Sequence, residues 1–129
     1  MKVTRVHHVS VNTGDVDLEE MANFYRDVLG LRDEPRPHIA GVEGHWLTLG
    51  DSQLHLVAAP PLGPPIDPLG DHYCVSVADL DAAISELDAR GIEYFRGVQD
   101  PDRADGGVVQ IWFADPAGHT IELQQETRP

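Results

Sequence analysis

The chain has 129 residues, 41% of them hydrophobic, and its 22 Asp and Glu against 9 Lys and Arg give a net charge of −13. This length suits one domain made of two small modules, and the acidity argues against binding to nucleic acid or anionic membranes, whose phosphates would be repelled. No apolar stretch reaches transmembrane length, and the N-terminus lacks a signal-peptide core.

The first half predicts a strand, a helix and three further strands. Residues 3–12 alternate between apolar and polar positions, as in a strand. Residues 17–29 carry one apolar stripe, which predicts a helix that begins at Asp17 and stops at Gly30. Three strand-like segments follow, near 36–42, 45–49 and 53–58.

The second half repeats this order. Residues 72–77 predict a strand, Asp79 is expected to cap a helix over 80–90, and Gly91 is expected to end it. Three strands are predicted after it, near 92–96, 107–114 and 119–125. Residues 97–106 are polar and are expected to form a loop.

A proline-rich segment separates the halves. Five of the ten prolines fall between residues 59 and 70, which indicates a stiff, extended linker. We therefore expect one domain over 1–129, with module 1 at about 3–58 and module 2 at about 71–125.

The repeat brings polar residues to matching positions. His8 and His72 each stand seven residues before an Asp, at Asp15 and Asp79. His55 and Glu122 lie on the last strand of each half. Alternation places all four on the polar face of their strands, opposite the aliphatic residues. Two such sheets facing each other would form a half-open barrel with a polar floor.

This set of side chains suits a divalent metal. Imidazole favours Zn, Fe, Ni or Cu, and two His with one carboxylate is also the ligand set of non-haem Fe(II) sites. Trp46, Arg36 and Ser10 are candidates for the substrate pocket, although a core Trp and a surface Arg are the plainer interpretations of the first two.

Two other residues receive plainer interpretations. His7 is expected to point away from His8, because neighbours in a strand alternate. The single cysteine, Cys74, lies in an apolar run and is interpreted as a small core residue. A lone cysteine cannot form an internal disulfide, which fits a cytoplasmic protein.

Several motifs together resemble the vicinal oxygen chelate superfamily, which includes glyoxalase I, bleomycin-resistance proteins, fosfomycin-resistance enzymes, methylmalonyl-CoA epimerase and extradiol dioxygenases. The motifs are HHV at 7–9, FYRDVLGL at 24–31, HLV at 55–57, DHYCVSVADLDAA at 71–83 and FADPAGHTIEL at 113–123. The resemblance implies an α+β fold of two repeated βαβββ modules that form a half-open β-barrel cleft around a metal.

By this resemblance, His8, His72 and Glu122 match recurrent metal-ligand positions. His55 falls where glyoxalase I-like enzymes usually carry Glu and epimerases carry Gln, which puts glyoxalase I activity itself in doubt. The implied protein is a homodimeric enzyme with a divalent metal (Zn, Ni, Mn or Fe(II)) and a small substrate with vicinal oxygens. Its chemistry would be that of a lyase, an isomerase or a dioxygenase, and Glu122 or His55 would serve as the base if either leaves the metal, with no choice made between them. The alternative is a non-catalytic protein that sequesters an antibiotic or metabolite.

Overall fold

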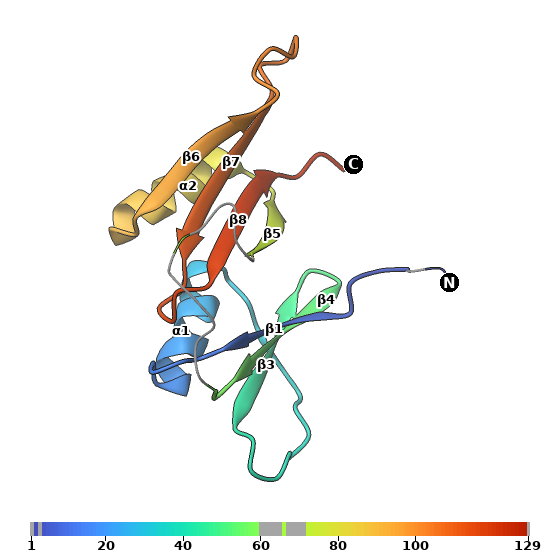
Figure 1. Ribbon diagram of the computed structural model, residues 1–129, viewed down its shortest axis with the longest axis vertical. Coiled ribbons are helices and arrows are strands. Elements are labelled where there is room, and N and C mark those ends of the chain that lie inside the picture. Colours follow the sequence, from blue (N-terminus) through green and yellow to red (C-terminus); the bar gives the residue numbers. More distant parts are fainter. Residues whose placement is uncertain (1, 3, 60–65, 67–71, 129) are drawn as a thin grey trace. The chain divides into compact units, whose positions relative to one another are not determined.

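The fold consists of two copies of the same unit. The computed structural model describes residues 2, 4–59, 66 and 72–128, and the chain divides into Met1–Gly63, here module 1, and Pro64–Pro129, here module 2. Each module contains one helix and a four-stranded open sheet in the order strand, helix, three strands (Figure 1). The predicted α+β fold with a doubled βαβββ unit is thereby confirmed. Most of the predicted linker at 59–70 lies outside the described residues.

Module 1 places its first strand beside its last. Its elements are β1 (His8–Asn12), α1 (Leu18–Val28), β2 (Asp33–Glu34), β3 (Gly44–Leu49) and β4 (Ser52–Val57). The strand order is β1-β4-β3-β2, with β1 parallel to β4 and the other pairs antiparallel. The crossover through α1, β2 and β3 therefore brings the two predicted ligand strands into direct contact.

Module 2 has the same topology. Its elements are β5 (His72–Val77), α2 (Leu80–Arg90), β6 (Tyr94–Gln99), β7 (Val108–Ala114) and β8 (Thr120–Gln125). The order is β5-β8-β7-β6, again with the first and last strands parallel and adjacent. None of the helices among the described residues is long and apolar enough to span a membrane.

Both helices begin and end where the sequence predicts. The Asp17 carboxylate accepts hydrogen bonds from the backbone N–H groups of Glu19 and Glu20, and the Asp79 carboxylate accepts one from Ala82. These caps satisfy donors that have no partner inside the helix. Gly91 ends α2 in the left-handed conformation, at φ 67°, which glycine adopts without steric cost.

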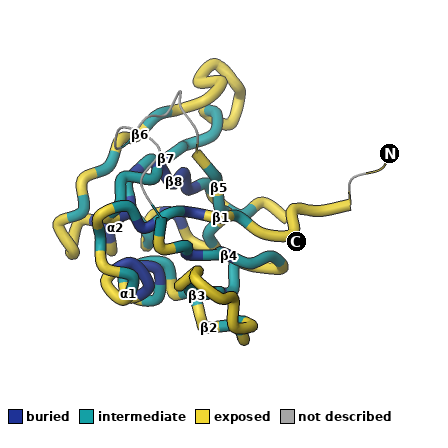
Figure 2. The backbone as a smooth tube through the Cα atoms, turned by 60° about the horizontal axis from the view of Figure 1, so that its bottom comes forward, coloured by how far each residue is buried: buried dark blue, intermediate teal, exposed yellow. Residues whose placement is uncertain are grey.

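Each helix covers one face of its own sheet and leaves the other face to polar residues. In module 1, α1 contacts β4, and in module 2, α2 contacts β8. Figure 2 shows the buried positions in dark blue, and they include parts of the helix and strands that contact each other. The core of module 1 comprises Val11, Met21, Ala22, Tyr25, Leu47, Leu54 and Leu56, and that of module 2 comprises Leu80, Leu87, Ile111, Phe113, Ile121 and Leu123.

Three strand predictions need correction. The strand expected over 3–12 is shorter, because β1 begins only at His8. The strand expected at 36–42 is wrong: β2 covers only Asp33–Glu34, and the chain then loops to β3. Pro35 and Pro37 explain this result, because proline has no N–H to continue a ladder. In module 2, β6 runs from Tyr94 to Gln99, so the polar loop begins at Asp100 rather than at residue 97.

Candidate functional site

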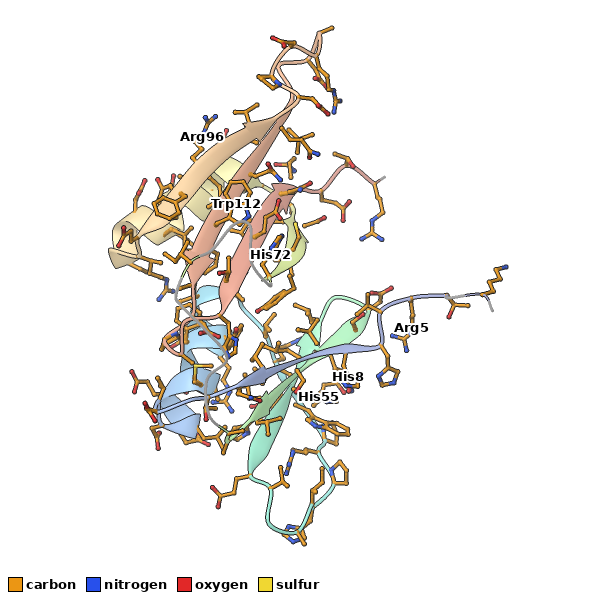
Figure 3. The ribbon with its side chains drawn as sticks, in the orientation of Figure 1. Arg5, His8, His55, His72, Arg96 and Trp112 are labelled. Carbon is orange, nitrogen blue, oxygen red and sulfur yellow. The ribbon has the colours of Figure 1, made fainter. Side chains whose placement is uncertain are left out.

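Three parallel rings lie on the polar face of module 1. His8 comes from β1, and His55 comes from β4, where it is registered opposite Trp46 of β3. The His8 and His55 ring centroids are 4.1 Å apart with planes 14° from parallel, and those of His55 and Trp46 are 4.3 Å apart with planes 5° from parallel. Because β4 lies between β1 and β3, the His55 imidazole is held between the two other rings. Figure 3 labels His8 and His55 on their neighbouring strands.

In each of the two histidines, His8 and His55, one ring nitrogen lies within hydrogen-bond distance of a neighbouring side chain and the other does not. Nε2 of His55 lies 2.9 Å from Oε1 of Gln53, and Nδ1 of His8 lies 2.9 Å from Nδ1 of His7. Nδ1 of His55 and Nε2 of His8 have no such partner among the described residues. Burial lowers the pKa of His55, and the positive charges of His8, His7 and Arg36 lower it further. A lowered pKa favours the neutral form of His55, which is the form that binds metals.

The polar face of module 2 carries the second pair. His72 of β5 and Glu122 of β8 approach each other, with Nε2 of His72 3.0 Å from Oε2 of Glu122. Glu122 is only 4% exposed. Its other oxygen, Oε1, accepts hydrogen bonds from Nε2 of Gln110 at 2.7 Å and from Nε2 of Gln124 at 2.9 Å. The two amide N–H groups and the imidazole that faces Oε2 therefore compensate this carboxylate for its loss of water.

Trp112 of β7 is a site residue that the sequence interpretation missed. It is registered opposite Glu122, as Trp46 is opposite His55, so each module places a tryptophan beside the residue on its last strand. Its indole packs over Gly97, where a Cβ would come within 2.8 Å of the ring. Its Nε1 is buried without a hydrogen-bond partner among the described residues. The signal that could have found it is an alignment of the two halves from His55 and Glu122 that allows one extra residue in the turn before Glu122, since Trp46 lies nine residues before His55 and Trp112 lies ten before Glu122.

The structure thus brings the predicted ligands together as two pairs, one in each module. No group of three or more His, Cys, Asp or Glu in the described part of the chain is arranged as a metal site. Ser10 is registered opposite His55 and shares its polar face. Arg36 donates to the carbonyl of Val42 at 2.9 Å from the loop after β2, not from a strand as expected. His7 also differs from expectation: it precedes β1, so strand alternation does not apply, and its ring contacts His8.

Cys74 is not the core residue that the sequence suggested. It is exposed and registered opposite Glu122, on the polar face of module 2. Partial burial of its thiol raises its pKa to about 11, and the negative charge of Glu122 adds to the effect. Because only the thiolate is nucleophilic, Cys74 is a poor nucleophile at neutral pH.

This pKa predicts slow thiol modification. Since the chain has a single cysteine, 5,5′-dithiobis(2-nitrobenzoate) reports on Cys74 alone. The fraction of thiolate at pH 7.5 should be ~100-fold below that of a thiol with a pKa of ~9, and the reaction rate should still be rising at pH 10. Glu122→Gln should accelerate the reaction, because it removes one cause of the raised pKa. A rate that levels off near pH 9 would contradict the assignment.

Comparison with known proteins identifies the family. The profile of the Glyoxalase/Bleomycin resistance protein/Dioxygenase superfamily matches residues 5–123. The chain belongs to this superfamily. Among curated members, it is 32% identical to Glyoxylase I 4 of Arabidopsis thaliana over 95% of this chain and 71% of that protein. It is 29% identical to the mitochondrial methylmalonyl-CoA epimerase of Mus musculus over 96% of this chain and 74% of that protein.

Solved structures of superfamily members share the fold. A glyoxalase family protein from Bacillus anthracis superposes with a TM-score of 0.78 at 25% identity and covers 98% of both chains. A lactoylglutathione lyase from Agrobacterium tumefaciens gives 0.74 at 18% identity, over 97% of this chain and 96% of that chain. The second likeness, at its low identity, concerns the fold alone.

Proposed function

We propose that this superfamily member is a metal-dependent enzyme with lyase or isomerase chemistry on a small substrate that carries two vicinal oxygens. The observation that carries the proposal is the pairing of His72 with Glu122. Metal–ligand bonds of ~2.1 Å at right angles separate adjacent donor atoms by ~3.0 Å. The distance between Nε2 of His72 and Oε2 of Glu122 is 3.0 Å, so these atoms suit neighbouring positions around one ion.

The ligand set that we propose is His8, His55, His72 and Glu122. Three neutral imidazoles and one carboxylate would leave a divalent ion with one net positive charge. When bound, the metal would supply Lewis acidity that stabilises negative charge on the substrate oxygens. Zn, Ni, Mn and Fe(II) are the candidates that this mixed nitrogen and oxygen set admits.

The chain's own residues would supply the rest of the chemistry. Glu122 or His55 would move the proton, and Trp46 and Ser10 would line the substrate site from module 1, with Arg36 available to an anionic group. The two relatives named after enzymes, a glyoxylase I and an epimerase, support proton movement beside a carbonyl. The net charge of −13 disfavours a substrate with several phosphates, which argues against a coenzyme A thioester.

Metal analysis with a paired assay tests this proposal. Plasma emission of the purified protein should find about one Zn, Ni, Mn or Fe ion per chain. Removal of this ion by a chelator should abolish product formation from 2-oxo or 2-hydroxy substrates. The rival is a binding protein that sequesters its ligand. If a ligand binds tightly and no product forms with any of the four metals, the binding function replaces the enzymatic one.

The stack of rings in module 1 predicts an optical signal for metal binding. Parallel rings 4.1 Å apart hold their nitrogens farther apart than the ~3.0 Å between neighbouring ligands, so His8 and His55 must turn to share an ion. This movement should change the emission of Trp46. In a Trp112→Phe variant, where Trp46 is the single tryptophan, Zn²⁺ should shift the fluorescence, and an added His55→Ala change should remove the response. Zn²⁺ that binds without altering the emission would exclude these two ligands.

A homodimer is the second part of the proposal. Among the described residues, the first strand of each module is a sheet edge that pairs with one neighbour, β1 with β4 and β5 with β8. Such edges favour association with another chain, and one chain could then supply His8 while its partner supplies His72 and Glu122. Sedimentation equilibrium should give twice the 14.2 kDa mass of one chain. A monomer at micromolar concentration would contradict this expectation.

A further inference from the structure

The two oxygens of the Glu122 carboxylate have different surroundings. Oε1 accepts two amide hydrogen bonds, from Gln110 and Gln124, whereas Oε2 faces the ring nitrogen of His72. The residue is 4% exposed, so water does not compete freely for either oxygen. One oxygen is therefore occupied by the protein, and the other is directed at the second predicted ligand.

The sheet itself builds this arrangement. Gln124 lies two residues after Glu122 on β8, and side chains two apart share one face of a strand. Gln110 lies two residues before Trp112 on β7, and Trp112 is registered opposite Glu122. Both amides thus start from paired neighbouring strands in the middle of the sheet, which fixes where their N–H groups can point.

The donors leave the carboxylate little freedom to rotate. If the Glu122 carboxylate turned to bring both oxygens to a metal, it would weaken both amide hydrogen bonds and leave two partly buried donors poorly satisfied. In other metal sites, outer-shell partners of this kind orient the ligand, and their loss typically costs about 10–100-fold in metal affinity or activity. The contacts of Glu122 therefore favour coordination through one oxygen.

We propose that Gln110 and Gln124 are positioning residues that hold Oε1 of Glu122, so that Glu122 binds the metal through Oε2 alone. The inference rests on the proposed metal-dependent function.

Methionine substitutions test the role of the two amides. Gln110→Met, Gln124→Met and the double variant keep an unbranched side chain of similar length and remove the N–H donors. We expect the affinity for Mn²⁺, measured by electron paramagnetic resonance, to fall ~10–100-fold in the double variant. The visible spectrum of the Co²⁺-loaded variant should differ from that of the wild type, because the carboxylate can then bind through both oxygens. In turnover, kcat should fall more than KM changes.

Gln99→Met is the matched control. Gln99 is an exposed glutamine at the end of β6 in the same sheet, and its change should leave metal affinity and spectrum as in the wild type. Wild-type affinity and an unchanged Co²⁺ spectrum in the double variant would overturn the inference while leaving the proposed function intact. If the wild type bound none of these metals, the proposed metal-dependent function would be wrong, and the inference that rests on it would be wrong too. If the double variant did not fold, as judged by thermal unfolding, the two single variants would decide by the same two measurements.

Discussion

Glu122→Gln is expected to abolish metal-dependent turnover. Gln keeps the shape of the side chain but has neither the negative charge that a metal ligand supplies nor the basicity to take a proton. Its amide would also present an N–H group to one of the donors that now serve the carboxylate. A loss of ~10²–10⁴-fold in kcat is expected, the range that follows removal of an acid–base group.

The pattern of losses separates the enzyme from the binding protein. An enzyme should lose far more in product formation than in substrate affinity, whereas a protein that only sequesters its ligand would barely respond. The control is Glu86→Gln, the same change at an exposed position on α2, on the helix side of the module 2 sheet. Equal turnover in wild type and Glu122→Gln would remove Glu122 from the reaction.

The second large effect is expected from His72→Ala. The ring lies on the polar face of β5 at its exposed first residue, so little apolar packing is lost and the fold should persist. The affinity for the metal should fall by more than the ~10–100-fold that follows loss of an outer-shell partner. The metal content of the purified variant should therefore fall sharply. Plasma emission of the purified variant, with circular dichroism to check folding, makes the measurement.

His38→Ala is the control for this substitution. His38 is an exposed histidine of the loop between β2 and β3, so the variant should keep its metal. Unchanged stoichiometry in His72→Ala would exclude His72 from the ligand set and would leave Glu122 without the neighbour that its Oε2 faces.

The helices and the polar faces could be predicted because their signals are local. Asp17, Asp79 and Gly91 mark helix ends through hydrogen bonds and backbone angles that neighbouring residues determine. Alternation along a single strand likewise assigns His55 and Glu122 to the polar face. The register between strands is not local, and this is why Trp112 and the two amides on Glu122 were missed. His7 was misplaced because alternation was applied to a residue that lies before its strand.

The prolines on either side of Arg36 explain why the strand expected at 36–42 does not form. The two prolines around Arg36 contradict a strand at 36–42, although the aliphatic residues later in that segment favour one. The loop that replaces it still brings the Arg36 charge close enough to His55 to lower its pKa.

Strand β2 has a consequence for how the protein behaves at high concentration. An exposed sheet edge is a template on which strands from other molecules can add, and long flat edges promote aggregation. Here the outer edge of the module 1 sheet is only two residues long and is followed at once by Pro35. A strand from another molecule would find almost no ladder to extend there, so this edge of the sheet gives fibres little to grow from.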